Sequence, residues 1–328
     1  VLNIIKPCND MIVLDIGSND NTLLSFYPKK VKTFGFEPAR NIKPIKNKKK
    51  IKVVNNYFNY KDWSIISKKK PRIITSCAMF YDLPNPNQFV EDINRVIDDK
   101  GIWCVQISYL LSMIKNMNFY DICHEHLSYH SIDSMEQLMT NNNLKIFKIE
   151  LNEVNGGSIR FYVCKKNCEQ YDTKENLSKI KQLKIKEKKF KLKNKKTYQN
   201  FNAKINLYKK KIIKLINKIY FKNQKIIGLG ASTKGNILLQ HFGLNKKHIP
   251  SISERNKEKV GLKCIGTDIK LISEKSAREM KPNYMLVLPW YFKKEIVIRE
   301  KKYLQKGGKL LFPMPYPHLV TYKNEIKL

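Results

Sequence analysis

The sequence predicts an α/β protein in which two Rossmann-like units are joined by a helical connector. Short apolar runs alternate with helix-like patterns over the first half of the chain, and a glycine turn follows an apolar run near Gly17 and again near Gly230. A Lys-rich segment separates the two patterns. We therefore divide the chain into residues 1–165, 166–222 and 223–328, and its 328 residues with 42% hydrophobic content can form more than one core.

The first unit contains five apolar runs that we interpret as parallel strands joined by crossover helices. Pro84, Pro86 and Gly101 bound a helix over 87–97, and a further helix begins at Asp133 or Ser134, where a capping side chain precedes an apolar pattern. Residues 146–151 and 158–164 read as an antiparallel pair across a glycine turn. The five parallel runs are 12–16, 33–36, 51–54, 73–77 and 102–107.

The connector carries 21 Lys against 4 acidic residues between Lys165 and Lys225. Its second half has apolar residues at alternating steps of three and four, which predicts one helix with a narrow apolar stripe. We expect the stripe to pack against the chain's own domains, and a dimer seam is the alternative; the oligomeric state is open. The stripe consists of Tyr198, Phe201, Ile205, Tyr208, Ile212, Leu215 and Ile219.

The second unit opens with a strand, a glycine turn and a helix start over 226–235, and further apolar runs follow at 285–288 and 310–312. Backbone amides at a helix start, together with Ser232 and Lys234, could form a phosphate cradle. Gly228, Gly230 and Gly235 could equally serve only tight packing of the helix on the strand.

The net charge of +35 invites a nucleic-acid interpretation, but 56 of the 63 basic residues are Lys. Base and phosphate recognition favours the bidentate Arg side chain, so we expect a solvated surface and no nucleic-acid partner. The charge does predict attraction for anionic ligands, weakened by salt. No apolar run is long enough to span a membrane and no secretory signal precedes the first strand, so a cytoplasmic protein without a membrane partner is expected.

The seven cysteines contain no Cys-x-x-Cys pair, and we interpret them as reduced thiols without a metal site. His124 and His126 are two residues apart, a spacing that places them on different faces of a helix, and no third ligand is evident. No metal is therefore expected at this cluster.

The turn after the first strand has the features of a nucleotide site. Gly17 permits close approach of a ligand to the backbone, and Glu37 closes the second strand 22 positions after Asp15. An acidic residue at that place can accept hydrogen bonds from ribose hydroxyls. The turn lacks the three glycines of a dinucleotide fingerprint, which argues against NAD.

The sequence His124-Glu125-His126 places a carboxylate between two imidazoles, an arrangement that suits a general base with an orienting group. In isolation it could also be a structural hydrogen-bonded knot. Tyr129 and His130, just downstream, could line a pocket or serve only packing.

These motifs occur in the order found in S-adenosylmethionine-dependent sugar C-methyltransferases, which the chain resembles over nearly its whole length. The resemblance rests on residues 13–24, Glu37-Pro38-Ala39, His124-Glu125-His126, Asn155-Gly156-Gly157-Ser158 and the second glycine turn. It implies a class I methyltransferase domain that binds S-adenosylmethionine and a Rossmann-like C-terminal domain. It also implies C-methylation of a nucleotide-linked 4-keto deoxysugar through a base-generated enolate.

The resemblance also assigns residues to roles. Asp15, Gly17, Asn19 and Glu37 would bind the cofactor, and His126 would be the catalytic base with Glu125 beside it. Substrate contacts would come from His124, Tyr129, Ser232 and Lys234, and Arg160 after the glycine turn could line the sugar pocket or belong to a plain hairpin.

The chain departs from the family pattern in three features. The chain begins with Val and shows no cysteine-rich zinc-binding domain, so we expect a truncated form. Asn21 stands where the first motif usually has glycine, and Asn tolerates left-handed backbone angles. Cys123 stands where tyrosine is common. A methyltransferase-like protein that only binds a nucleotide sugar is the alternative function, and a basic RNA methyltransferase is disfavoured by the scarcity of Arg.

Overall fold

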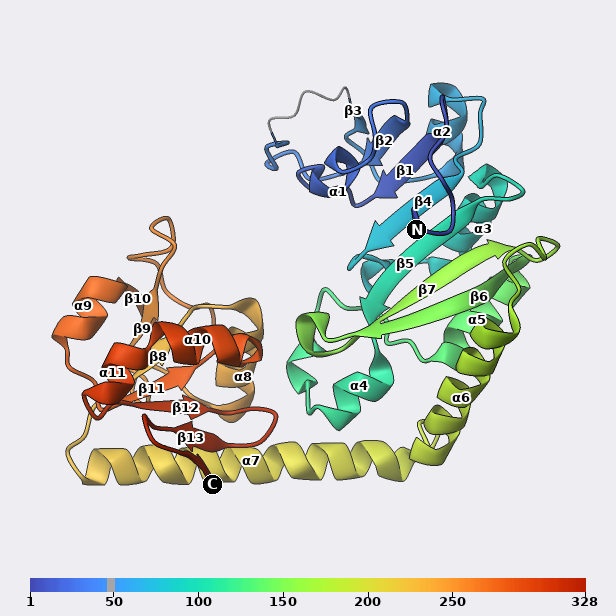
Figure 1. Cartoon of the computed structure of the whole chain (residues 1–328). Helices are drawn as coiled ribbons and strands as arrows, with labels where there is room; N and C mark the ends of the chain where they lie inside the picture. Colours follow the sequence, from blue (N-terminus) through green and yellow to red (C-terminus); the bar gives the residue numbers. More distant parts are fainter. Residues whose placement is uncertain (46–50) are drawn as a thin grey trace. The chain divides into compact units, whose positions relative to one another are not determined.

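The structure is a computed structural model that describes residues 1–45 and 51–328 and divides the chain into two compact units (Figure 1). The first unit comprises Val1–Ser112 and His124–Leu192, and the second comprises Met113–Cys123 and Lys193–Leu328. The helical segment predicted between the two Rossmann-like units is thus shared: one helix belongs to each unit. Each unit contains its own sheet of seven strands in the part of the chain that is described.

The first sheet has the strand order β3-β2-β1-β4-β5-β7-β6. Strands β1 to β5 are parallel where they pair, and β7 is antiparallel to both β5 and β6. The strands are β1 Ile12–Ile16, β2 Lys32–Phe36, β3 Ile51–Val54, β4 Ile73–Cys77, β5 Ile102–Ser108, β6 Leu144–Asn152 and β7 Ser158–Lys165. The predicted parallel runs and the predicted antiparallel hairpin are all confirmed.

The helices between these strands are short, apart from α3 and α6. They are α1 Thr22–Ser25, α2 Tyr60–Ile66, η1 Phe80–Asp82, α3 Pro86–Val96, α5 Ile132–Asn141, η3 Val154–Gly156 and α6 Lys174–Phe190, while α4 Leu110–Lys115 runs across the boundary of the two units. The predicted cap of α5 is wrong by two or three residues: Ser131 is the cap, because its side chain and that of Ser134 each accept the other's backbone amide.

The core of the first unit lies along the middle strands. β1 is buried at every position, and Trp103 of β5 is fully buried with its indole nitrogen donating to Ser76 Oγ at 2.8 Å. Helix α6 is anchored by Glu187, which is buried and accepts hydrogen bonds from Tyr109 Oη and the amide of Ile132, both at 2.8 Å. A buried carboxylate is tolerated when its acceptors are satisfied in this way.

The second sheet has the order β10-β9-β8-β11-β12-β13-β14. Its first five strands are parallel where they pair, so the order around β8 repeats the order around β1 in the first sheet. The strands are β8 Ile226–Leu229, β9 Ser251–Glu254, β10 Lys270–Ser273, β11 Tyr284–Val287, β12 Lys309–Phe312, β13 His318–Val320 and β14 Glu325–Lys327. The helices are η2 Phe119–Asp121, α7 Lys195–Phe221, α8 Thr233–Phe242, α9 Glu274–Glu279, η4 Trp290–Phe292, α10 Lys293–Arg299 and α11 Lys301–Gln305.

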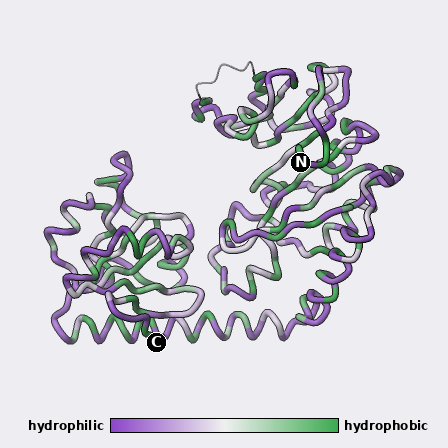
Figure 2. Tube along the Cα trace, viewed as in Figure 1, coloured by the Kyte–Doolittle hydropathy of each residue, from purple (hydrophilic) through white to green (hydrophobic). Residues whose placement is uncertain are grey.

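Helix α7 confirms the predicted helix and extends beyond it at both ends. Figure 2 shows apolar and polar positions alternating along it. Its apolar stripe is buried within the chain, as expected, except that Ile216 replaces Leu215 as the buried residue and Tyr198 is 40% exposed. Beside the stripe, Lys211 Nζ donates to the carbonyl of Leu328 in the same unit at 2.6 Å.

The segment 113–123 leaves the first unit and packs into the second. Phe119 stacks on Phe242 of α8 with ring centroids 5.6 Å apart, and Tyr120 meets Trp290 edge to face at 4.6 Å. The segment then returns to the first unit at His124. The predicted catalytic cluster therefore begins where the chain re-enters the first unit.

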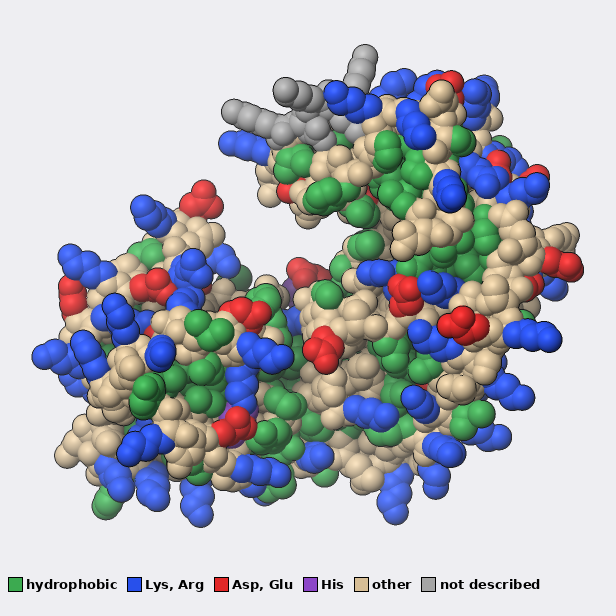
Figure 3. Space-filling model, in the orientation of Figure 1, with side chains coloured by type: hydrophobic (Ala, Val, Ile, Leu, Met, Phe, Trp, Pro, Cys, Tyr) green, Lys and Arg blue, Asp and Glu red, His purple; other side chains and the backbone are tan. Residues whose placement is uncertain are grey.

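Lys and Arg side chains are spread over the visible face of both units, with Asp and Glu among them, rather than gathered in one patch (Figure 3). Within the described residues, no helix is both long and apolar enough to cross a membrane.

Candidate active site

The turn after β1 is built around left-handed backbone angles. Gly17 has φ +72°, a conformation that favours glycine, and a Cβ there would lie 3.2 Å from Met79 Cγ, a close contact that the Met79 side chain would have to relieve. Asn21 at the start of α1 has φ +67°, the left-handed conformation expected for a position usually held by glycine. The cofactor turn thus keeps its shape with Asn in place of glycine.

Glu37 connects the end of β2 to this turn. Its Oε2 accepts the amide of Asn19 at 2.8 Å, its Oε1 accepts the amide of Ala39 at 2.9 Å, and the residue is 8% exposed. A carboxylate has about four acceptor positions. Two of them are used by the backbone, which fixes the carboxylate in place and leaves two for a ligand.

Asp15 lies at the end of β1, buried, and accepts a hydrogen bond from Thr75 Oγ1 at 2.5 Å. Burial raises the pKa of Asp15 to about 7; the Thr75 hydroxyl opposes the shift, and the negative charge of Glu37 adds to it. The charge of this buried site therefore depends on pH near neutrality through Asp15.

All four residues predicted to bind the cofactor line one pocket of about 870 Å³ at the carboxyl ends of β1, β2 and β4. That volume falls within the range of small-molecule sites. Parallel strands that end together form such a crevice where the chain reverses its direction of progress across the sheet, here between β1 and β4. The residues present therefore fit a nucleoside cofactor of the size of S-adenosylmethionine.

Several lining residues were missed by sequence reasoning. They come from the end of β4, from η1 and from the loop after β3, and include Ala78, Met79, Asp82, Asn56 and Tyr57. Ala78 has φ +56°, an unusual angle for alanine that marks a constrained strand end. The end of β4 could have been found, because β4 neighbours β1 and its carboxyl end must lie at the same edge of the sheet.

His126 contacts Tyr81, the residue that precedes the pocket residue Asp82 in the chain. Its ring is 4.3 Å from the ring of Tyr81, and the amides of Leu127 and Ser128 donate to the Tyr81 carbonyl at 2.9 and 3.1 Å. Tyr81 is followed by Asp82, which lines the pocket. Burial raises the pKa of Asp82, while the nearby His126 lowers it and Glu125 raises it, so all three groups share one electrostatic environment.

The other residues of this cluster differ in exposure. The side chain of His124 is 91% exposed, and its Nε2 is 3.9 Å from Glu125 Oε1, so Glu125 faces His124 rather than orienting His126. Tyr129 is half-buried. His130 packs inside the unit against Phe80 with its Nε2 2.8 Å from Ser128 Oγ, and burial lowers its pKa to about 4, which keeps the ring neutral.

Arg160 belongs to the predicted hairpin, with the turn at η3 between β6 and β7. Its Nη2 donates to Gln106 Oε1 at 2.8 Å and its Nη1 to Glu150 Oε2 at 3.2 Å. Burial raises the pKa of Cys77, which lines the cofactor pocket, to about 11, and the positive charge of Arg160 opposes this shift. Arg160 itself is not among the residues that line the pocket.

The second glycine turn is organised like the first. Glu254 at the end of β9 accepts the amide of Ala231 at 2.7 Å through Oε2, and its Oε1 accepts the amides of Arg255 and Asn256. Glu254 and Ser232 line a cavity of about 360 Å³. Sequence reasoning missed Glu254, although it follows Gly228 by 26 positions, a spacing comparable to that between Asp15 and Glu37.

Ser232 and Lys234 are placed differently. Ser232 caps α8 by accepting the amide of Gly235 at 3.0 Å. Lys234 Nζ forms an ion pair with the buried Asp121 at 2.8 Å and lies 5.0 Å from the Tyr120 ring centroid. Lys234 therefore neutralises a buried carboxylate of η2, and the structure does not place it with Ser232 in the lining of the cavity.

The fold and this pocket define an S-adenosylmethionine-dependent methyltransferase. Residues 6–149 match the model of a methyltransferase domain, and residues 153–315 match the model of a C-methyltransferase C-terminal domain. The chain belongs to the S-adenosylmethionine-dependent C-methyltransferases, which confirms the expected family and its cofactor.

The chain is similar to a named C-methyltransferase and to a methyltransferase of solved structure. It is 24% identical to C-methyltransferase NovU of Streptomyces niveus over 318 residues, which are 96% of this chain and 75% of that protein. A complex of the plantazolicin methyltransferase BpumL with a triazolic desmethylPZN analog and SAH aligns with a TM-score of 0.40 at 14% identity, over 51% of this chain and 80% of that one.

Proposed function

We propose that the chain methylates a carbon next to the ketone of a nucleotide-linked 4-keto deoxysugar. The observation that supports this proposal is the contact of His126, a half-buried imidazole, with the ring of Tyr81, which precedes the pocket residue Asp82 in the chain. The resemblance to sugar C-methyltransferases and the similarity to NovU support a sugar as substrate. A binding protein without catalysis would not need an imidazole at that place.

The reaction needs a base, because the attacking carbon must first lose a proton. A hydrogen on carbon beside a ketone is acidic enough to remove since the electron pair left behind delocalises onto the carbonyl oxygen. His126 takes that proton at a ring nitrogen, and the nearby carboxylate of Asp82 stabilises the imidazolium that results. When bound, S-adenosylmethionine supplies an electrophilic methyl group on a sulfonium.

The cofactor is held by the first glycine turn. Gly17 and Asn19 present backbone to the ligand, and the two free acceptor positions of Glu37 receive ribose hydroxyls. Asp15 contributes to the same wall of the pocket. Glu125 and His124 are exposed, so their proposed part is contact with the substrate rather than proton transfer.

The nucleotide of the substrate is assigned to the cavity of the second unit. Glu254 repeats the role of Glu37, and the amino end of α8 with Ser232 offers backbone amides to a phosphate. Lys234 is paired with Asp121, so its proposed part is to hold the first turn of α8 in place for the substrate rather than to meet a phosphate directly.

Solvent exchange tests the role of His126. In heavy water, with the keto sugar nucleotide and the demethylated cofactor, the wild-type protein should exchange the hydrogen beside the ketone without methyl transfer. His126→Ala should lose exchange and methylation by about 10² or more, with unchanged cofactor affinity, and His248→Ala in the second unit is the control. Methylation by His126→Ala within a few-fold of wild type would refute the assignment.

A further inference from the structure

A second cavity of the second unit lies at the edge of the sheet opposite the glycine turn. Its volume is about 650 Å³, and its lining includes Asn283 and Gly308, which immediately precede β11 and β12. Because β8, β11 and β12 are parallel, the amino ends of β11 and β12 lie at the edge away from the carboxyl end of β8, where the glycine turn begins. The two cavities therefore lie toward opposite edges of the sheet, and Arg299 is the lining residue that they share.

The lining of this cavity is strongly basic. Five of the eleven lining residues are cationic: Arg278, Lys281, Arg299, Lys302 and Lys306. The acidic residue among those eleven is Glu300, which leaves the lining with an excess of four positive charges. Such a concentration of positive charge in a concave surface attracts anions, and a bound anion reduces the repulsion between the cations.

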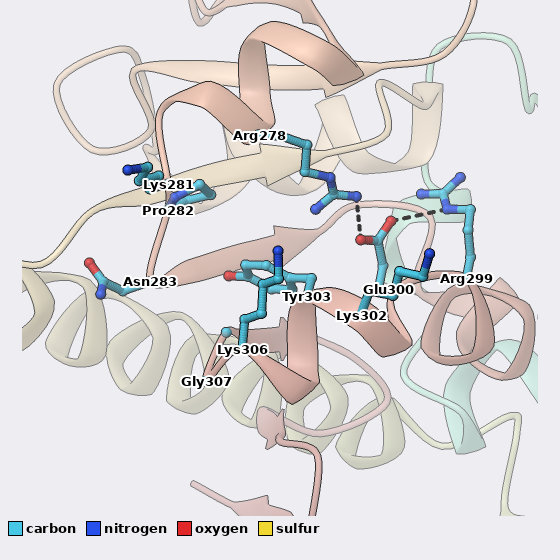
Figure 4. A pocket seen from close by; sticks show the side chains of 11 residues that line it. Arg278, Lys281, Pro282, Asn283, Arg299, Glu300, Lys302, Tyr303, Lys306 and Gly307 are labelled. Carbon is cyan, nitrogen blue, oxygen red and sulfur yellow. Dashed lines mark hydrogen bonds and ion pairs between the residues drawn. The ribbon is translucent and has the colours of Figure 1, made fainter.

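Glu300 organises the arginines rather than neutralising the cavity. Its side chain is 1% exposed, and it is bonded to Arg278 Nη2 and to Arg299 Nε, the latter at 3.1 Å. Each guanidinium keeps further N–H donors for other partners. Figure 4 shows Arg278 reaching toward Glu300 from one side, while Lys302 and Lys306 rise from the α11 side around the ring of Tyr303.

The ring of Tyr303 forms a wall of the cavity that offers little room for stacking. The guanidinium of Arg278 is 5.6 Å from its centroid, and a Cβ on Gly308 would lie 2.4 Å from ring atoms, so glycine packs directly against the ring. The recognition elements that remain are charged N–H donors. They suit compact oxyanions, and several cations around one space suit an anion of more than one charge.

We propose that this cavity binds a small molecule bearing two or more adjacent phosphate groups. The two arginines, fixed by Glu300, contact one phosphate, and the flexible lysines close on the next. Free diphosphate and the diphosphate of a nucleotide share this chemistry. The competing explanation is that the cations only compensate the carboxyl ends of α9 and α11, where Lys and Arg are commonly found.

Calorimetric titration with pyrophosphate at 0.15 M salt tests the proposal. Lys302→Gln with Lys306→Gln should weaken binding at least about tenfold, since two cationic contacts are lost while Glu300 keeps both arginines. The matched control is Lys294→Gln with Lys301→Gln, which removes the same charge from exposed positions of α10 and α11 that do not line the cavity. The control should bind like wild type.

Three results would overturn the proposal: no binding by wild type, equal weakening in both double variants, or a lowered melting temperature of Lys302→Gln with Lys306→Gln at unchanged affinity. The last would favour the helix-end explanation. Unchanged pyrophosphate affinity of Lys302→Gln with Lys306→Gln would mean that pyrophosphate binds outside this cavity, as at the site near Ser232, which these substitutions do not touch. Titration with uridine diphosphate identifies the source: tighter binding than pyrophosphate indicates a nucleotide, and equal binding indicates free diphosphate.

Discussion

Replacing Glu37 by Ala should weaken S-adenosylhomocysteine binding by about two orders of magnitude. The carboxylate is buried and fixed by the amides of Asn19 and Ala39, so its two remaining acceptor positions are preorganised for ribose hydroxyls. A hydrogen bond to a charged group contributes about 1.5–3 kcal/mol. Two such bonds at the lower value give about 3 kcal/mol, which corresponds to about 10² in dissociation constant.

The assay must separate ribose contact from support of the turn, because Glu37→Ala also frees two amides. Calorimetry with S-adenosylhomocysteine and with its 2′-deoxy analogue provides that separation. Wild type should prefer the hydroxylated ligand by about tenfold, and Glu37→Ala should not discriminate. Glu91→Ala, on the exposed side of α3, is the control and should retain the preference. A preference that survives unchanged in Glu37→Ala would refute the ribose assignment.

Three further predictions concern stability, measured by chemical denaturation. The pKa of Asp15 is about 7 in the folded state against 3.8 for an ordinary Asp, so between these pH values the folded state holds a proton that the unfolded state has lost. Wild type should therefore lose about 3 kcal/mol of stability relative to Asp15→Asn as pH rises from 4 to 7, and parallel pH profiles would contradict this. Ile212→Ala in the buried stripe of α7 should cost about 2–4 kcal/mol, whereas Lys214→Ala, exposed on the same helix, should cost little; equal losses would argue against the buried stripe. Asn21→Gly should be nearly neutral while Asn21→Ala costs about 1–2 kcal/mol, because only alanine is strained at φ +67°, and the reverse order would exclude that explanation.

The sequence was sufficient for elements whose signal is local. The strand at Ile12–Ile16 is apolar throughout and was predicted with its observed bounds, whereas β10 at Lys270–Ser273 has polar ends and carries no such signal. The helix stripe was right except at Leu215, because steps of three and four from Ile212 reach both Leu215 and Ile216 and only packing selects one. The carboxyl ends of parallel strands lie at the same edge of a sheet, and this rule places Glu37 at the same edge as Asp15.

Other parts of the site depend on contacts between residues far apart in the chain. His126 contacts Tyr81, which precedes it by 45 positions in the chain. No sequence spacing predicts that Asp82 is its neighbouring carboxylate. Lys234 was expected in a phosphate cradle, but its partner Asp121 comes from a segment that precedes it by more than 100 residues. Such pairings are decided by topology, which local patterns do not encode.

The excursion of residues 113–123 into the second unit has a consequence for dissecting and recombining this protein. The chain crosses between units after Ser112, after Cys123 and after Leu192, so no single cut yields two intact domains. In a fragment ending at Leu192, the rings of Phe119 and Tyr120 would lose their contacts with Phe242 and Trp290. In the remaining C-terminal fragment, Lys234 would lose its ion pair with Asp121. A chimera that exchanges the C-terminal module with a relative must therefore exchange residues 113–123 with it.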